Sequence, residues 1–427
     1  MTTGNVVVDA PRQPGTFMPG GRLGALRSRD FSLFFGAALL SNIGTWMQAI
    51  TVPAVLFAQT GQAKWLGYAT FAQLGPGIVI GPYASVAADR FQRRKVVLVS
   101  QAFQGIGALG LWVMWVTHTS SAARILILLA LIGLSGAIGG PSWQSLVPLL
   151  APPEDLLSAV RLNAMQFSGS RAIGPAIGGL VYANFGPSWA FFVNGLSYVL
   201  VVAAMAVVRP RPQPLHSGEK HVLRDFADGL RYIRRTKALQ YVILGLIVSV
   251  FFAATLPQLA AAFATDMFHV SRTKYGLLVT AYGLGSLLAL VVLTAIGDVL
   301  ARSHQAVAGF VISLVGFGLL AVAHGYGMGV LGFFVAGVGF LTVGNALQLA
   351  MQVRVSEQYR GRVGGIYLIT FQGTLPLGVL ALGALSDRVG LREMLVVSSI
   401  VFTVYVVLLL VRSNMLVAFN ETVADDD

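Results

Sequence analysis

Twelve long apolar stretches follow one another along the chain, and few charged residues interrupt them. About 20 helical residues, at about 1.5 Å rise each, cross a hydrocarbon core of about 30 Å. Because a chain in lipid must satisfy its own backbone hydrogen bonds, stretches of this length form helices. The pattern predicts an all-α membrane protein with twelve transmembrane helices. Their expected ranges are 32–58, 65–87, 96–117, 125–149, 157–183, 189–208, 240–262, 275–297, 305–324, 328–351, 364–385 and 394–411.

A polar segment, residues 209–238, divides the twelve stretches into six and six. Its proline-rich beginning should be extended. From Val222 onward, apolar residues recur at helical spacing with arginines and aspartates between them, which predicts an amphipathic helix on the inner membrane surface with its arginines toward anionic lipid. The expected division is a tail (1–30), a six-helix bundle (31–208), the linker (209–238), a second six-helix bundle (239–412) and a tail (413–427).

The two halves of the chain also show an internal sequence repeat. A shift of 204 residues places Gly179 on Gly383, Gly186 on Gly390 and Gln144 on Gln348. Together with the central linker, these matches predict a duplicated architecture of the kind from which many transporters are built.

Charge sorts the two sides of the membrane. The chain is 56% hydrophobic and 11% charged, with a formal net charge of +12. If the twelve stretches alternate in direction, 21 basic residues lie on the side of the termini and linker and six on the other. By the positive-inside rule both termini are cytoplasmic, and the excess charge does not indicate a nucleic-acid partner.

Other kinds of chemistry find little support in the composition. Cysteine is absent, which excludes disulfides and thiolate metal sites, and the six histidines fall in loops or at helix ends. We therefore expect no metal and no cofactor. None of the 17 acidic residues lies near the centre of a predicted span, so proton coupling has no obvious intramembrane carboxylate.

The segment after the second stretch, residues 84–95, places Asp89 at a helix end among basic residues. An acid there can lock neighbouring helices together and later release them. The alternative, anchoring by the positive-inside rule, explains the arginines but not the aspartate. The pattern resembles the signature loop of the major facilitator superfamily, although Ser85 and Gln92 replace its two glycines. The gating candidates are Asp89, Arg90, Arg94 and Lys95, with Asp298 and Arg302 as a weaker counterpart after the eighth stretch.

The fifth stretch contains the run GPAIGG (174–179), in which the glycines and the proline are Gly174, Pro175, Gly178 and Gly179. Small residues let helices approach closely in lipid, and proline bends a helix, so plain helix packing explains the run equally well. The run nevertheless resembles the end of a fifth-span motif found in exporters of the same superfamily, with Ser170 at the upstream glycine position. This resemblance favours export over uptake.

Polar groups near mid-membrane are costly, so each is a candidate for substrate binding, although hydrogen bonding between helices is the alternative for every amide. Asn163, Gln166 and Ser170 share one helical face. Arg171 is the one charge expected deep in the membrane, either as an anion-binding residue or bonded to helix carbonyls. The binding candidates are Asn42, Trp46, Gln48, Gln73, Trp143, Gln144, Asn163, Gln166, Arg171, Phe251, Phe252, Asn345, Gln348 and Gln372.

Four longer phrases, at 33–50, 141–167, 170–180 and 360–367, are similar to the enterobactin-exporter-like, or transmembrane secretion effector, branch of the superfamily. The resemblance covers most of residues 29–412. It implies a secondary exporter of the bacterial inner membrane that carries a siderophore, drug or other secondary metabolite. We expect the protein to work as a monomer and to be coupled to protons.

Three alternatives stay open at this point. The same fold could serve uptake or lipid flipping, and a relative that lost the transport cycle could act as a receptor or scaffold. An integral-membrane enzyme is the third, but the sequence contains no HExxH or GxSxG motif to support it. A GxxxxGK[ST] phosphate loop is also absent, which argues against direct drive by ATP.

Overall fold

A computed structural model describes residues 23–212, 222–297, 299–411, 416, 419 and 420. Within them every regular element is a helix. The first half contains η1 (Gly24–Arg27), α1 (Arg29–Thr60), α2 (Lys64–Arg90), α3 (Arg93–Val116), α4 (Ala122–Leu146), η2 (Val147–Leu149), η3 (Pro153–Asp155), α5 (Leu156–Phe185) and α6 (Pro187–Val207). The second half contains α7 (Val222–Arg235), α8 (Lys237–Phe252), α9 (Leu256–Ala262), η4 (Phe263–Met267), α10 (Arg272–Ile296), α11 (Arg302–Ala321), α12 (Tyr326–Arg354), η5 (Glu357–Tyr359), α13 (Arg360–Val389) and α14 (Leu391–Val411).

The helix boundaries repeat at the offset of 204 residues that the sequence predicts. Helices α5 and α13 have 30 residues each, α6 and α14 have 21 each, and both pairs begin and end 204 positions apart. The junctions within these pairs are Gly186 and Gly390, with φ angles of +79° and +98° that favour glycine. The predicted repeat is therefore confirmed at the level of individual helix ends.

Ten helices or helix runs in the described part of the chain are long and apolar enough to cross a membrane. The chain is thus a multi-pass membrane protein. Helices α2 and α5, with 27 and 30 residues, are long enough but are not among the ten. Both contain glycines and polar side chains, and α5 carries Arg161 and Arg171, which lower its mean hydropathy.

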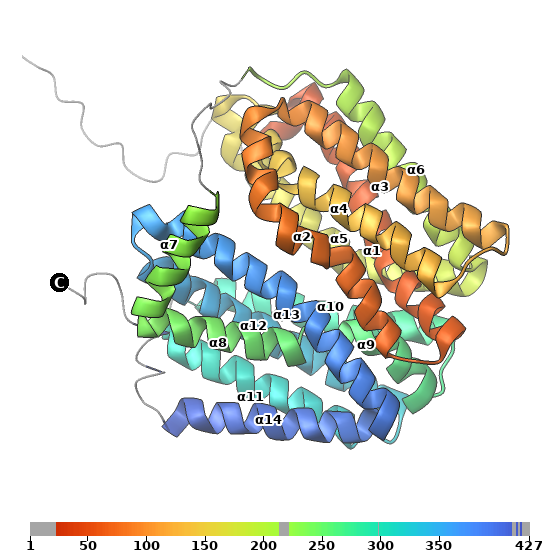
Figure 1. Ribbon diagram of the computed structural model, residues 1–427, viewed down its shortest axis with the longest axis vertical. Coiled ribbons are helices and arrows are strands. Elements are labelled where there is room, and N and C mark those ends of the chain that lie inside the picture. The colour runs from red at the N-terminus through yellow and green to blue at the C-terminus, as the bar shows by residue number, and fades with distance from the viewer. Residues whose placement is uncertain (1–22, 213–221, 298, 412–415, 417–418, 421–427) are drawn as a thin grey trace, which may run out of the picture.

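The long helices form two groups, α1 to α6 and α8 to α14, which contact each other along a few helices (Figure 1). Helix α2 packs against α13, α5 against α10, and α1 against α9. In the repeat α2 corresponds to α10 and α5 to α13, so the first two contacts are equivalent. Helices α7 and α9 lie at opposite ends of the long helices. We call the end near α7 the linker face, and the end where residues 61–63 join α1 to α2 the far face.

The first membrane helix of the second group is interrupted. The sequence predicts one continuous span over 240–262, but residues 253–255 separate α8 from α9, and a π-helical turn, η4, follows. Pro257, in the first turn of α9, has no backbone N–H to donate. Two carbonyl groups at the break have side-chain partners, because the Tyr282 hydroxyl donates to the Ala253 oxygen at 2.9 Å and Thr255 Oγ1 donates to the Phe251 oxygen at 2.8 Å.

The predicted linker helix is present as α7 and packs against the second group. Its described part spans Val222–Arg235, within the range that the sequence predicts to be helical. Arg362 of α13 forms an ion pair with Asp225 at 2.7 Å and lies 3.8 Å from Asp228. Tyr232 stacks on Tyr359 with ring centroids 4.4 Å apart. These contacts attach α7 to the start of α13.

Candidate functional site

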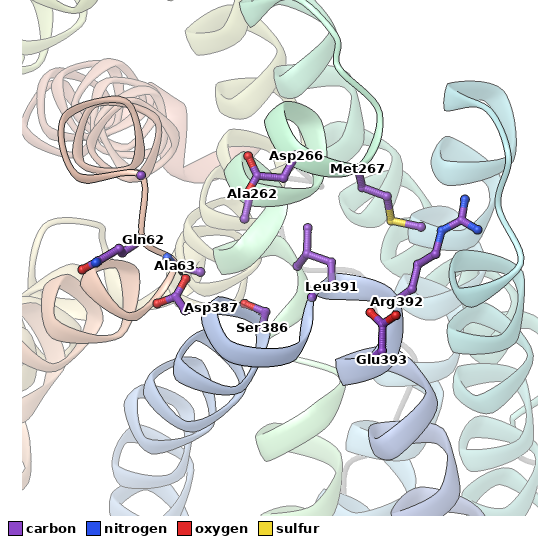
Figure 2. Close-up of a pocket in the computed structure, with 12 residues that line it drawn as sticks. Gln62, Ala63, Ala262, Asp266, Met267, Ser386, Asp387, Leu391, Arg392 and Glu393 are labelled. Atoms are coloured by element: carbon purple, nitrogen blue, oxygen red, sulfur yellow. Dashed lines mark hydrogen bonds between the residues drawn. The ribbon is translucent and has the colours of Figure 1, made fainter.

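The two groups are joined at the far face by one carboxylate (Figure 2). Asp387 lies in the last turn of α13, and its Oδ1 accepts a hydrogen bond from the Ala63 backbone N–H at 2.6 Å. Its Oδ2 accepts from the Lys64 backbone N–H at 3.0 Å. The first N–H groups of a helix have no partner within the helix, and the helix dipole favours negative charge there. Asp387 therefore caps α2 from the other helix group.

A cavity of about 530 Å³ adjoins this contact and is lined by both groups. Figure 2 shows Asp387 directed toward Ala63, with Arg392 and Glu393 on the other side of Leu391. Arg392 donates to the Ala323 oxygen at 2.7 Å, which holds its guanidinium against the end of α11. In the part of the chain that the structure describes, no cluster of three or more His, Asp or Glu side chains is arranged to hold a metal ion. The complete lining is Gly61, Gln62, Ala63, Ala262, Asp266, Met267, Ser386, Asp387, Gly390, Leu391, Arg392 and Glu393.

Glycine and tyrosine contacts close the same half of the interface. A Cβ atom on Gly179 of α5 would lie 2.9 Å from the Cα of Gly276 of α10, so these two backbones meet directly. The buried Tyr275 hydroxyl donates to the Ile50 oxygen of α1 at 2.8 Å. Helix α5 thus reaches the second group through a glycine, and α10 reaches the first group through a tyrosine.

The glycines of the predicted exporter run serve two different contacts. Gly174 and Gly178 face α1, where added Cβ atoms would meet Trp46 and the Cα of Met47. Gly179 faces α10 instead. The run therefore both packs α5 within its own group and lets it approach the other one. Pro175 is part of α5, but its side chain lies outside the described residues.

Near the middle of the interface, one predicted binding residue touches the opposite group. The Oε1 of Gln372 on α13 lies 2.6 Å from where a Cβ atom on Gly77 of α2 would be. Gln372 thus packs against the α2 backbone, on the helix that also carries the half-buried Gln73.

Several other predicted binding residues have partners within their own group. The Asn194 amide donates to Gln48 Oε1 at 2.8 Å, and the Asn345 amide donates to Gln305 Oε1 at 3.4 Å. These two bonds match the alternative that the sequence left open for the amides, hydrogen bonding between helices.

The predicted aromatic residues also pack within their own groups. Trp143 packs on Phe34, and Trp46 packs edge-on against Phe167, both in the first group. In the second, Phe252 packs against Phe251 and Phe402.

The predicted polar face of α5 contains atoms without partners. Gln166 and Ser170 are 4% and 0% exposed, and neither side-chain nitrogen nor oxygen atom of Gln166, nor Ser170 Oγ, has a hydrogen-bond partner. An unpartnered buried polar group costs about 1–3 kcal/mol, so water or a ligand group would be favoured beside it. Asn163 and Asn42 are half-buried, whereas the repeat-related Gln144 and Gln348 are both exposed. The side chain of Arg171 lies outside the described residues.

Two of the predicted gating residues, Arg94 and Arg302, bind backbone oxygens on the linker face. Arg94 donates to the backbone oxygens of Met205 and Ala206, each at 2.6 Å, and so caps the C-terminus of α6. Lys95 is exposed, and Arg302 donates to the Asn420 oxygen at 2.7 Å. Asp298 and the side chains of Asp89 and Arg90 lie outside the described residues, although Asp89 and Arg90 belong to the last turn of α2.

Sequence reasoning missed Asp387, although a signal for it exists. The dipeptide Asp–Arg occurs at the end of α2, as Asp89–Arg90, and again at the end of α13, as Asp387–Arg388. An acid in the last helical turn is unfavourable to its own helix dipole, so a partner from elsewhere is expected. The first occurrence is followed by three consecutive basic residues, Arg93, Arg94 and Lys95, whereas no such run follows the second, where Arg392 stands beside Glu393.

Comparison with known proteins gives two kinds of match. A family described as "Transmembrane secretion effector" matches residues 21–424. The enterobactin exporter EntS of Shigella boydii serotype 4 (strain Sb227) is 24% identical over 353 residues, which cover 79% of this chain and 80% of the relative. EntS of Escherichia coli O81 (strain ED1a) is 24% identical over 352 residues, with the same coverage.

Solved structures with a similar fold are membrane transporters. A bacterial homologue of the lysosomal transporter Spinster, inward-facing and occupied, has a TM-score of 0.74 at 13% identity and covers 93% of this chain and 98% of its own. The nucleoside transporter NupG has a TM-score of 0.70 at 13% identity, with 92% and 98% covered. A bacterial homologue of ferroportin, inward-facing, has a TM-score of 0.66 at 16% identity, with 88% and 98% covered.

Proposed function

Because the chain belongs to the transmembrane secretion effector family of the major facilitator superfamily, we propose that it is a secondary active transporter that exports a small organic molecule by alternating access. The observation that carries this proposal is the interface between the helix groups. Two repeats meet through equivalent helix pairs, and the cap, glycine and tyrosine contacts described above lie in the half of the interface toward the far face. Rocking of one repeat against the other is the motion that such an arrangement serves.

The membrane arrangement belongs to the same proposal. Helices α2 and α5 are the two spans that complete twelve, and α8, α9 and η4 together form one. The bundles are then 31–208 and 239–412, joined by the linker 209–238 and flanked by tails at 1–30 and 413–427. The bacterial EntS relatives support an inner-membrane location. The 21-to-6 distribution of basic residues supports an orientation in which both termini and the linker face are cytoplasmic. The far face is then the outer side.

The substrate class follows from the relatives and the neutral polar side chains. EntS proteins are enterobactin exporters by name, which supports a siderophore, drug or other secondary metabolite as cargo. The unpartnered Gln166 and the interface residue Gln372 are the amides best placed to bind it. We propose protons as the coupling ion and a monomer, without a cofactor, as the working unit.

The proposal is tested by untargeted mass spectrometry of the medium. A bacterial host deleted for its own siderophore and drug exporters would express the chain or carry the empty vector. We expect at least one small organic compound to rise in the medium and fall in the cells. A compound that instead accumulates inside the cells would indicate uptake, and an unchanged profile at verified membrane expression would favour a receptor or scaffold.

A further inference from the structure

We propose that Asp387 is the latch of the outer gate, holding the end of α13 to the start of α2 while the outer side is closed and releasing it when that side opens. This inference rests on the proposed alternating-access function and deepens it. The latch is a contact between the two repeats, since Asp387 and its partners Ala63 and Lys64 are more than 320 positions apart in the chain.

The chemistry of the contact makes it reversible. In the last turn of α13 a negative charge is unfavourable to its own helix dipole, so Asp387 gains its stabilisation from α2. The N–H groups of Ala63 and Lys64 in turn have no partner within α2. If the groups separate, water must solvate both ends. The contact therefore stabilises one conformation of the interface without contributing to either helix group alone.

The surroundings support a contact that can open. The cavity of about 530 Å³ borders Asp387 directly, which places solvent-sized space beside the carboxylate. Its neighbour Glu393 lies in the same cavity but over Gly390, within the second group. A Cβ atom on Gly383 would lie 2.7 Å from the Ala63 oxygen. The backbone of α13 therefore lies close to the start of α2 one helical turn before Asp387.

The test is a distance measurement that needs no substrate. The native chain has no cysteine, so spin labels can be attached at Thr119→Cys and His324→Cys, exposed far-face positions on opposite helix groups. Double electron–electron resonance in lipid nanodiscs then reports the population with a separated far face. We expect Asp387→Ala to raise the ratio of separated to closed molecules about tenfold, the scale of losing a charge-assisted hydrogen bond. Asp387→Glu should restore part of the closed population.

The matched control is Glu393→Gln, which removes a carboxylate from the same cavity and should leave the distances unchanged. If Asp387→Ala does not give a monodisperse protein, Asp387→Asn is used instead. A wild-type distance distribution in the Asp387 variant, or an equal shift in Glu393→Gln, would overturn the latch. Because the readout is conformational, a shift without any exported compound would leave the latch standing and reject the proposed function.

Discussion

Asp387 and Asp89 occupy matching places on two helices that pack along each other. Contacts pair Gly383 with Ala63 and Gln372 with Gly77, so α13 and α2 run in opposite directions. Each helix therefore ends in an Asp–Arg pair beside the start of its partner. Asp387 caps α2 at the far face, and the backbone places Asp89 on the linker face, where α13 begins. We infer that the two acids serve opposite gates.

At Asp89, the substitution Asp89→Asn should impair transport without preventing membrane insertion. The reason is our proposal that the carboxylate serves to close the linker face, whereas the surrounding arginines alone set the topology. A lost charge-assisted hydrogen bond is worth about 1.5–3 kcal/mol, which shifts a two-state gate about tenfold or more. Efflux of the exported compound is compared with that of the wild type at equal membrane abundance. Unimpaired efflux by the variant would refute the role of this residue.

The role of Arg171 can be tested with Arg171→Gln, because anion binding and bonding to helix carbonyls predict different results. A charge in mid-membrane costs about 2.5–3.5 kcal/mol on insertion scales and needs a polar partner or an anionic substrate. If Arg171 binds an anion, affinity for the exported compound falls while thermal stability in detergent stays near that of the wild type. If it binds helix carbonyls, stability falls and affinity is unchanged. We expect the second result, which would remove the support for an anionic substrate at this residue, whereas the first would establish Arg171 as an anion-binding residue.

At this scale the sequence identified residue types better than partners. It placed amides on the membrane helices, but whether Gln48 binds Asn194 or a substrate depends on which helices become neighbours, and periodicity does not specify that. The contact of Asp387 could not be predicted for the same reason, since its partner lies more than 320 residues earlier in the chain.

Helix α5 shows how one short glycine run can serve two interfaces. Gly178 meets α1, and the next residue, Gly179, meets α10. Successive residues on a helix point about 100° apart, so one helix presents glycine to both neighbours. The run therefore contributes to packing within the first group and to contact between the groups.

The substitution Gly179→Val should weaken the closed far face. Its side chain would collide with Gly276, and overpacking of this kind costs about 1–3 kcal/mol. We expect a longer distance between spin labels at Thr119→Cys and His324→Cys. The control Gly169→Val lies on the same helix, where an added Cβ atom meets nothing within 4 Å, and should leave the distance unchanged. Equal behaviour of the two variants would contradict the contact between α5 and α10.

Helix positions were the most predictable feature, because hydrophobic length and internal repetition both specify them. The matched glycines at positions 186 and 390 mark helix junctions, and the helix predicted in the linker is present as α7. The continuous span predicted over 240–262 is wrong at residues 253–255. Thr255 and Pro257 mark this place in the sequence, but the hydroxyl that satisfies the Ala253 oxygen comes from Tyr282, on a later helix.

The molecule as a whole consists of two repeats that meet at one interface, and the distribution of basic residues predicts its orientation in the membrane. Contacts described at the far face join the repeats, while α7 packs against the second group on the linker face. If the linker face is cytoplasmic, the structure is closed toward the outside.

This orientation predicts the labelling of Ser217→Cys, in the linker between α6 and α7. The variant carries the only cysteine of the chain, so a membrane-impermeant maleimide reports one site. We expect no labelling in intact cells and full labelling after permeabilisation, with Thr119→Cys as the outward-facing control. Labelling of Ser217→Cys in intact cells would contradict the prediction that the linker is cytoplasmic.

The direction and energy source of transport are tested most directly in everted inner-membrane vesicles, with the compound that expression raises in the medium as the probe. Protons pumped inward by respiration should drive its accumulation in everted vesicles that contain the protein. A protonophore should abolish the accumulation, and vesicles without the protein should show none. Accumulation that requires right-side-out vesicles, or that persists without a proton gradient, would contradict proton-coupled export.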